Sequence, residues 1–351
     1  MEWYQYLLII LGSLIILDGL IIGLLYLATS KAFGHRYDGN PKLKYFTYRD
    51  FSELEVEEFH FTSNHGQTLV GLIYRSKETI DDGRMIIFFH GIGAGHEAYT
   101  KEIRLLVKLT KLPVIAFDYT GCGRSSGSKI IGLTQPLIDA DYLMRYLAKM
   151  PSFIDKKYIA IGHSWGAYVA NNLSALKPKI TLERRITMSG FIHPVLEMAD
   201  QMKMPFLRPF LAQLSFLVFG RYHFYRGDRS LKNSHIDSLI IHGKKDNVVP
   251  FTHHAEWLFE AVQHHPHLTM IACEKKKHNP YLTPQAEEGL LEVLRKDIQF
   301  IKNKATESEE AKVFYASIDY DYIGENDLEL FKRITNFIHH GGKLDDGKTN
   351  C

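Results

Sequence analysis

One short segment, residues 158–170, restricts the fold more than any other part of the chain. An apolar, β-branched run stops at Gly-His-Ser-Trp-Gly (162–166), and a helix-compatible run follows at once. This order predicts a strand, a sharp turn and a helix, with Ser164 in a strained backbone conformation at the turn. The residues two before and two after that serine must be small, and they are Gly162 and Gly166. The segment therefore predicts a nucleophilic serine at the edge of a sheet.

Strand-like and helix-like runs alternate through most of the chain. The first strand-like run alternates apolar and polar residues, and the second can pair with it as a hairpin across residues 64–66. Most later runs are continuously apolar, as strands covered on both faces should be. The eight runs are residues 54–61, 68–74, 85–89, 114–118, 158–161, 185–188, 239–242 and 268–272, and helical patterns separate several of them. We therefore expect an α/β fold over residues 51–340, with a mostly parallel eight-stranded sheet and helices on both faces.

An apolar insertion lies between the sixth and seventh strand-like runs, at about residues 191–236. Within it, apolar residues recur at the spacing of one helix face. Two interpretations are open: a helix packed on the body of the domain, or a cap over the serine whose apolar underside suits an acyl chain. The second places Phe206, Phe210 and Leu214 in the substrate site, because ligands bind at the carboxyl edge of such sheets.

The C-terminal part is expected to end in a helix. Residues 303–312 are polar and predict a solvated loop. Residues 327–339 carry apolar side chains on one helical face, which predicts a helix packed on the sheet. The tail, residues 341–351, is expected to be frayed.

The N-terminal segment is long and apolar enough to cross a bilayer. Residues 7–27 are rich in leucine and isoleucine, and about 20 such residues span the hydrocarbon core as a helix. We expect a transmembrane helix over residues 5–28 and a juxtamembrane linker over residues 29–50. Asp18 lies in the middle of the span, where we interpret it as tolerated, either protonated or paired with another helix.

A cleaved signal peptide is the competing interpretation of this segment. It is disfavoured because the region before the apolar run has no basic side chain and no clear small-residue cleavage site follows. Four basic residues follow the span, so the positive-inside rule predicts a single-pass protein of the cell membrane with a cytoplasmic body; they are Lys31, Arg36, Lys42 and Lys44. Three widely spaced cysteines suggest neither a disulfide framework nor a metal site and fit a reducing compartment. The net charge of +2 gives no reason to expect nucleic-acid binding.

A nucleophilic serine needs a base within hydrogen-bonding reach, oriented by a third group. In folds that carry the serine on such a turn, the acid and the histidine come later in the chain, on loops after strands. Asp246 follows the run 239–242 and a glycine turn, and His278 follows the next run. We expect the imidazole of His278 to accept the proton of Ser164 and Asp246 to orient that imidazole. The other histidines in this part of the chain are interpreted as structural or solvated.

An oxyanion site is expected beside the serine. Its donors would be the backbone N–H of Trp165, which follows the serine, and one N–H from the loop after the third strand. That loop, residues 90–95, is rich in glycine, and we nominate the N–H of Ile92. A phosphate-binding loop is the alternative, but no Gly-Lys-Ser/Thr follows to support it.

These motifs together resemble the α/β-hydrolase superfamily over roughly residues 51–338. The resemblance rests on residues 90–93, 117–127 and 162–166, and on Asp246 with His278. The second motif is similar to a loop of the branch that holds monoacylglycerol lipases, serine aminopeptidases and membrane-associated acyl-protein thioesterases. The resemblance implies hydrolysis of an ester, thioester or amide through an acyl-serine, with no metal or organic cofactor.

In that branch the loop at residues 117–127 shapes the floor of the active site, so Asp118 and Ser125 are not expected to be catalytic. The leading hypothesis is a membrane-anchored serine hydrolase acting on a lipid-like or acylated ester. A peptidase of the same fold, an acyltransferase and a non-catalytic membrane-tethered binding protein remain as alternatives.

Overall fold

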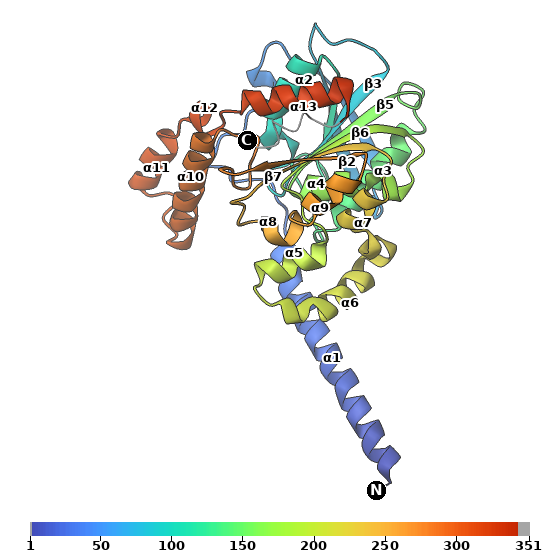
Figure 1. Ribbon diagram of the computed structural model, residues 1–351. Helices are drawn as coiled ribbons and strands as arrows, with labels where there is room; N and C mark the ends of the chain where they lie inside the picture. Colours follow the sequence, from blue (N-terminus) through green and yellow to red (C-terminus); the bar gives the residue numbers. More distant parts are fainter. Residues whose placement is uncertain (1, 343–351) are drawn as a thin grey trace.

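The computed structural model describes residues 2–342 and shows a helix-covered sheet from which one long N-terminal helix projects (Figure 1). The eight strands have the order β1-β2-β4-β3-β5-β6-β7-β8. β2 is antiparallel to both of its neighbours, and all other neighbouring strands are parallel. Their bounds are β1 Glu55–Thr62, β2 Thr68–Arg75, β3 Arg84–Phe89, β4 Val114–Phe117, β5 Lys157–His163, β6 Thr181–Met188, β7 Asp237–Gly243 and β8 Leu268–Cys273. The predicted mostly parallel eight-stranded sheet is confirmed.

Alternate residues of the central strands face opposite sides of the sheet, and each side has its own apolar core. In β3, Ile86 and Phe88 join the core beneath α2 (Thr100–Thr110) and α13 (Leu328–His340). Ile87 and Phe89 join the core beneath α3 (Gln135–Leu147) and α4 (Trp165–Asn172). On that second side α8 (Phe251–His254) and α9 (Leu258–His264) cover β7 and β8. Strands buried on both faces explain the continuous apolar runs in the sequence.

The insertion between β6 and β7 forms a helical cap. It contains α5 (Pro194–Gln201), α6 (Arg208–Phe219) and α7 (Gly227–Lys232). α5 and α6 lie beside α1, on the side of the body from which α1 projects (Figure 1). α7 packs against α4, and its Leu231 joins the apolar cluster over β7 and β8. The cap is thus the part of the body nearest the projecting helix.

The N-terminal helix α1 is one continuous element, Trp3–Phe33, of 31 residues. Its most apolar window has a mean hydropathy of 2.7, and α1 is the one helix among the described residues long and apolar enough to cross a membrane. A signal sequence meets the same criterion. The helix extends beyond the predicted span of residues 5–28 and occupies the start of the predicted linker, where Phe33 packs against the core beneath α3 and α4.

The C-terminal part contains more helix than expected. α10 (Pro284–Lys302), α11 (Glu309–Ala316) and α12 (Tyr320–Ile323) precede α13. The predicted loop over residues 303–312 ends early, because Ser308 caps α11 by accepting a hydrogen bond from the N–H of Ala311 at 3.2 Å. The expectation of a frayed tail concerns residues 341–351, of which 343–351 lie outside the described residues.

The cysteines differ from the expectation. Cys122 is a buried free thiol, whereas Cys273 takes part in a disulfide bond. The interpretation of the cysteines as a sign of a reducing compartment is therefore not supported by Cys273.

Candidate active site

Ser164 lies at the turn between β5 and α4, with φ 53° and ψ −112°. A positive φ is unusual for a residue with a side chain, so the predicted strain is present. Steric crowding requires glycine at the two flanking positions. A Cβ atom on Gly162 would overlap the backbone of Gly166, and one on Gly166 would overlap the carbonyl oxygen of Phe89. The turn can therefore form only with glycine at both positions.

The structure brings the three predicted triad residues into one hydrogen-bonded line. The Nε2 atom of His278 is 3.0 Å from the Oγ of Ser164, and its Nδ1 is 2.8 Å from the Oδ2 of Asp246. Asp246 follows β7 and His278 follows β8, so neighbouring parallel strands deliver both side chains to the same edge of the sheet. In this arrangement Nδ1–H donates to the carboxylate, and Nε2 is left to accept the serine proton.

Asp246 is held as a carboxylate by several donors. Its Oδ1 accepts hydrogen bonds from the N–H groups of Val248 and Val249, both at 2.9 Å. Its Oδ2 lies 3.3 Å from the Nε2 of His242 in addition to its contact with His278. Burial raises the pKa of Asp246, but the hydrogen bonds from His242 and His278 outweigh that effect and bring the pKa well below its ordinary value. The group opposite His278 is therefore negatively charged at neutral pH.

A second hydrogen-bonded chain links the loop after β3 to the histidine loop. The N–H of Gly91 donates to the hydroxyl of Tyr99 at 3.1 Å, and that hydroxyl is 2.8 Å from the Nδ1 of His163. The Nε2 of His163 is 2.8 Å from the carbonyl oxygen of His278. Only one tautomer satisfies every partner: Nε2–H donates to His278, and Nδ1 accepts from Tyr99. Burial, together with the nearby His278, lowers the pKa of His163 to about 3, which keeps this ring neutral.

Ile92 and Trp165, whose N–H groups are the predicted oxyanion donors, border the same cavity as Ser164. Trp165 is the first residue of α4, where an N–H has no partner within the helix. Among the described residues neither amide donates a hydrogen bond to the protein.

A buried histidine fixes the loop that carries Ile92. The ring of His90 stacks on Tyr119 at 4.0 Å between centroids, and its Nε2 accepts from the Tyr119 N–H at 3.4 Å. Its Nδ1 therefore carries the proton and donates to the carbonyl oxygen of Gly91 at 2.6 Å. Burial lowers the pKa of His90 to about 4, so the ring is neutral. The first histidine of the glycine-rich loop is thus a positioning residue.

Asp118 also has a positioning role. Its Oδ1 is 2.7 Å from the Nδ1 of the buried His96, and its Oδ2 accepts from the N–H of Arg124 at 2.8 Å. The hydroxyl of Ser125 donates to the carbonyl oxygen of Asp118 at 2.5 Å. Burial raises the pKa of Asp118, but the adjacent His96 outweighs this and lowers it. Neither Asp118 nor Ser125 borders the cavity at Ser164.

The cavity at Ser164 has a volume of about 420 Å³, within the range of small-molecule sites. Its walls come from the cap, the loop after β7 and the last turns of α1, and most of them are apolar. Two polar side chains of α5 also border it: the Nε2 of Gln201 donates to the Oε1 of Glu197 at 2.9 Å. Burial raises the pKa of Glu197 to about 8, so this carboxyl is largely protonated at neutral pH.

The three cap residues predicted to bind substrate do not border this cavity. Phe206 is 69% exposed, Phe210 packs in the apolar cluster between α1 and the cap, and Leu214 borders a smaller adjoining cavity. Periodicity showed which residues share a helix face, but not which way that face points. Phe191 and Met198 border the cavity in their place.

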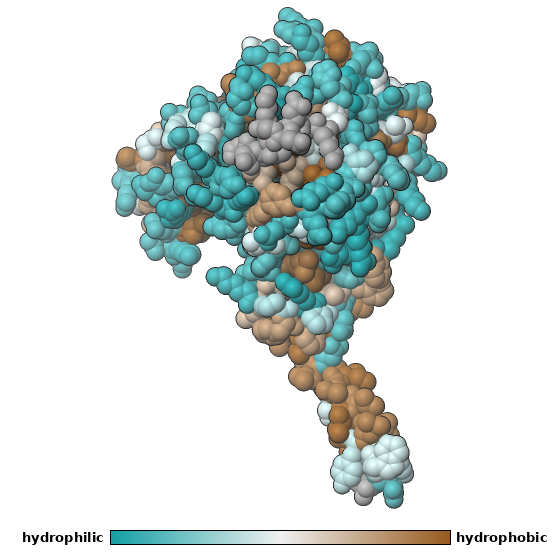
Figure 2. Space-filling view, viewed as in Figure 1, coloured by the Kyte–Doolittle hydropathy of each residue, from teal (hydrophilic) through white to brown (hydrophobic). Residues whose placement is uncertain are grey.

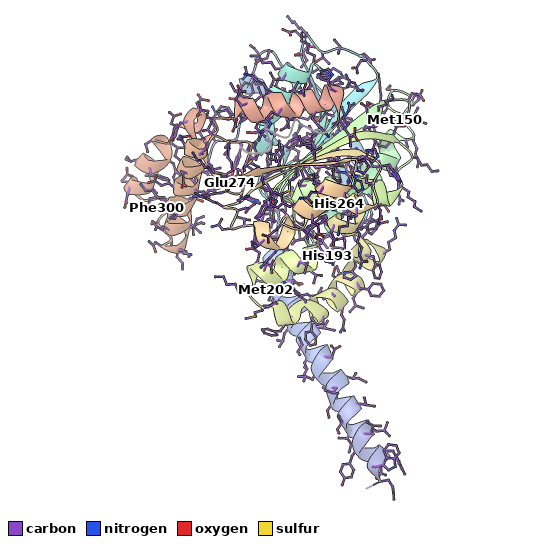
Figure 3. The ribbon with its side chains drawn as sticks, in the orientation of Figure 1. Met150, His193, Met202, His264, Glu274 and Phe300 are labelled. Atoms are coloured by element: carbon purple, nitrogen blue, oxygen red, sulfur yellow. The ribbon has the colours of Figure 1, made fainter. Side chains whose placement is uncertain are left out.

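Sequence reasoning missed the residues that hold the triad in position. His163 lies inside the serine motif, and His242 is four residues before Asp246, so both had a signal in their spacing. Tyr99 had none, because its partners are distant in the sequence. By contrast, His264 lies exposed on α9, as expected for a solvated histidine (Figure 3).

Within residues 2–342 no three His, Cys, Asp or Glu side chains are grouped as metal ligands would be.

Comparison with known proteins agrees with this fold. A model described as "Alpha/beta hydrolase family" matches residues 86–293. An esterase from Pyrococcus furiosus is 19% identical, with a TM-score of 0.51, over 77% of this chain and 98% of the esterase. Carboxyl esterase 2 from the mycorrhizal fungus Tuber melanosporum is 13% identical, with a TM-score of 0.50, over 79% of this chain and 87% of that protein. At these sequence identities the structural similarity shows a shared fold. No curated protein matches the chain significantly.

Proposed function

Because the chain belongs to the alpha/beta hydrolase family, we propose that it is a serine hydrolase that cleaves carboxylic esters or thioesters through an acyl-serine intermediate. The observation that carries the proposal is the line from Ser164 through His278 to Asp246, with distances of 3.0 and 2.8 Å. A serine hydroxyl becomes a good nucleophile when a positioned base removes its proton. The apolar cavity beside that serine supports a substrate with an acyl chain.

In the first step the Oγ of Ser164 forms a bond to the carbonyl carbon of the ester while its proton passes to the Nε2 of His278. The carbonyl electron pair moves onto oxygen, which accepts hydrogen bonds from the N–H groups of Ile92 and Trp165. The bond to the alcohol oxygen then breaks. The leaving alcohol takes the proton from His278, and the acyl group remains on Ser164.

In the second step a water molecule replaces the alcohol. Its oxygen bonds to the acyl carbon as one proton passes to His278, and the oxyanion forms again. The bond to Ser164 then breaks, and the serine oxygen recovers the proton from His278. The products are a carboxylic acid and the free enzyme. Asp246 remains a carboxylate throughout and stabilises the imidazolium that forms in each step.

We further propose that α1 anchors the protein in a membrane. Its length and mean hydropathy support this role, and basic residues that follow the apolar run favour a body on the cytoplasmic side. The disulfide bond of Cys273 is more typical of an oxidising compartment and is the observation against that orientation. Protease protection in sealed membrane vesicles decides between the two sides: a cytoplasmic body is digested from outside in inverted vesicles and protected in right-side-out vesicles.

A fluorophosphonate probe tests the serine directly. We expect the full-length protein to be labelled, Ser164→Ala to be unlabelled, and Ser189→Ala to be labelled like the parent. Ser189 is a matched control because it is a buried serine at the end of β6, also with positive φ, and it does not border the cavity. Labelling of Ser164→Ala equal to that of the parent would remove the proposal.

The leaving group is tested with p-nitrophenyl esters of increasing acyl length beside aminoacyl anilides. We expect turnover of the esters, with a preference for longer acyl chains because the cavity walls are mostly apolar. Faster turnover of the anilides would indicate a peptidase instead. Labelling without turnover of any ester would contradict the proposed hydrolysis.

A further inference from the structure

The helix α1 is attached to the cap over part of its apolar length. The Nε2 of Gln213 on α6 donates to the Oδ1 of Asp18 at 3.3 Å, which supplies the partner that this carboxylate needs. Further along, Leu25 is 6% exposed and packs with Leu211 and Leu214 of the cap. From about Asp18 onward, therefore, α1 runs beside the cap, and only the part before it projects freely (Figure 1).

The free part of α1 is shorter than a bilayer. The roughly 15 residues before Asp18 measure only about 22 Å at 1.5 Å per residue. The hydrocarbon core is about 30 Å thick. If α1 spans the bilayer, then the cap beside residues 18–25 must enter the membrane by about 8 Å or more. Amphipathic helices that lie in the interface are buried to about the same depth, 5–10 Å.

The surface of the cap is suited to that position. Its exposed side chains include large apolar groups that a soluble domain would normally bury, namely Met204, Phe206, Phe216, Leu217 and Phe224, with exposed fractions from 43 to 69%. Figure 2 shows apolar surface on the cap, continuous with the apolar surface of α1. Contiguous apolar surface of this kind marks a site of contact with a membrane or another protein. Its continuity with α1 favours the membrane.

The last turns of α1 form a wall of the cavity at Ser164. Ala28, Thr29, Ala32 and Phe33 border that cavity, directly after the apolar run that ends at Leu27. The opposite wall comes from the cap, including Met202, which lies near α1 (Figure 3). These walls of the cavity therefore lie at the level at which the membrane would end.

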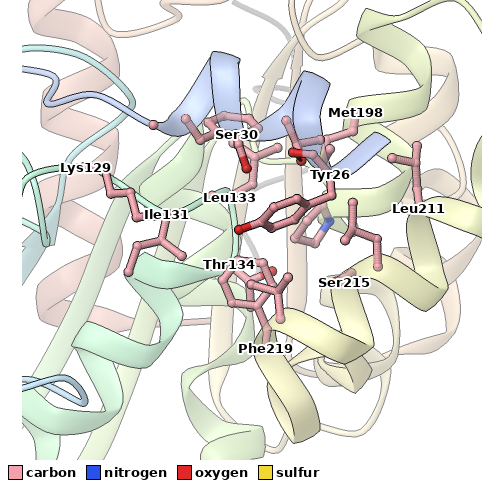
Figure 4. A pocket seen from close by; sticks show the side chains of 17 residues that line it. Tyr26, Ser30, Lys129, Ile131, Leu133, Thr134, Met198, Leu211, Ser215 and Phe219 are labelled. Carbon is pink, nitrogen blue, oxygen red and sulfur yellow. Dashed lines mark hydrogen bonds between the residues drawn. The ribbon is translucent and has the colours of Figure 1, made fainter. Parts of the chain in front are cut away.

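A second cavity continues the first along α1. It has a volume of about 130 Å³ and reaches from Tyr26 to Phe219 of α6 (Figure 4). The two cavities share four bordering residues, Thr29, Phe33, Leu133 and Met198. If a methylene group needs about the 30 Å³ of a water molecule in the liquid, the cavity at Ser164 alone holds on the order of ten methylene groups.

We propose that α1 is one wall of the acyl-binding site, and that the acyl chain of a membrane-resident ester passes from the bilayer, between α1 and the cap, into the cavity beside Ser164. This inference rests on the proposed function. It makes the substrate an amphiphile taken directly from the membrane, with its carbonyl group at the interface and its acyl chain between α1 and α5. The apolar side chains of the cap stabilise the enzyme at the depth where such chains are found.

The depth of the cap is measured without any activity. The full-length protein is placed in phosphatidylcholine nanodiscs that contain a phosphatidylcholine with a diazirine in its acyl chain. After illumination, we expect lipid adducts on peptides from residues 204–224 as well as on α1, and none around Met150, an exposed residue on a part of the body far from α1 (Figure 3). Adducts confined to residues 3–17 would overturn the proposal.

The wall itself is tested by filling the cavity from α1. For Ala32→Trp we expect kcat/KM for a dodecanoyl ester in nanodiscs to fall by about 10- to 100-fold, with little change for an acetyl ester. Leu27→Trp is the matched control, since Leu27 is 65% exposed and borders neither cavity. Equal effects of the two variants on the dodecanoyl ester would overturn the proposal.

The two proposals can fail separately. Fluorophosphonate labelling of Ser164 with no adducts on the cap would leave the serine hydrolase in place and remove the membrane route. Adducts on the cap without labelling of Ser164 would remove the proposed function and with it the substrate route. Labelling of Ala32→Trp at the parent rate shows that the variant is folded and that its loss concerns the acyl chain.

Discussion

Removal of one hydroxyl group, in Tyr99→Phe, should lower both stability and turnover. The hydroxyl accepts from the N–H of Gly91 and donates to the Nδ1 of His163, and the change leaves both of these buried groups without a partner. Each buried unsatisfied group costs about 1–3 kcal/mol. We therefore expect the free energy of unfolding in urea to fall by about 2–6 kcal/mol.

The same change releases the loop that carries Ile92, which follows Gly91. A displaced oxyanion donor lowers the rate of the chemical step more than it weakens substrate binding, so kcat should fall by about 10- to 100-fold with little change in KM. Steady-state kinetics with a short-chain p-nitrophenyl ester measures both constants. A purely structural role would lower stability and leave kcat per folded molecule unchanged.

Tyr158→Phe is the matched control for this prediction. Tyr158 is fully buried, and its hydroxyl donates only to the carbonyl oxygen of Phe153, at 2.7 Å, away from the site. We expect the free energy of unfolding of this variant to fall by about 1–2 kcal/mol and its kcat to be unchanged. The reasoning is refuted if Tyr99→Phe retains kcat within about twofold of the parent, or if its loss of stability does not exceed that of Tyr158→Phe.

Three further changes have distinct expected results. Asp246→Asn should lower kcat for a short-chain ester by about 10⁴-fold; a loss below tenfold would argue against its role in orienting the imidazole. Asp118→Asn should lower the free energy of unfolding by about 2 kcal/mol at pH 7. The pKa of Asp118 is lowered in the folded state, so the stabilisation by its carboxylate is lost as pH falls through that value, and urea unfolding should show the difference between parent and variant shrinking below about pH 4. A difference that stays constant with pH would contradict this. Gly166→Ala should lower the free energy of unfolding by more than about 3 kcal/mol or prevent folding, since its Cβ would overlap the carbonyl oxygen of Phe89. Gly23→Ala, with nothing within 4 Å and in a helix that favours alanine over glycine, should not lower the melting temperature.

The parts of the fold that the sequence predicted are those with local signals. Alternation within β1 and the continuous apolar runs of β2 and the later strands report burial on one or both faces. The turn at Ser164 could be recognised because its geometry permits only glycine at residues 162 and 166. Asp246 and His278 could be placed because each follows a strand, and neighbouring parallel strands end at one edge.

The remaining features depend on contacts between distant segments. Nothing near Tyr99 in the sequence indicates that its hydroxyl joins Gly91 to His163. The direction of the apolar face of α6 depends on where α1 lies, and for this reason the sequence could not show that Phe210 packs toward α1 and does not border the cavity at Ser164. The role of residues 28–33 as a wall of the cavity also arises only when the end of α1 meets the cap.

The central claim is that Ser164 forms a covalent acyl intermediate, and pre-steady-state kinetics joined to mass spectrometry tests it most directly. With a p-nitrophenyl ester in excess, we predict a burst of p-nitrophenol close to one equivalent per enzyme. Acid quenching during the burst should leave the added acyl mass on the peptide that contains Ser164. Hydrolysis that continues in Ser164→Ala at the parent rate, with no acyl mass on that peptide in the parent, would contradict the account.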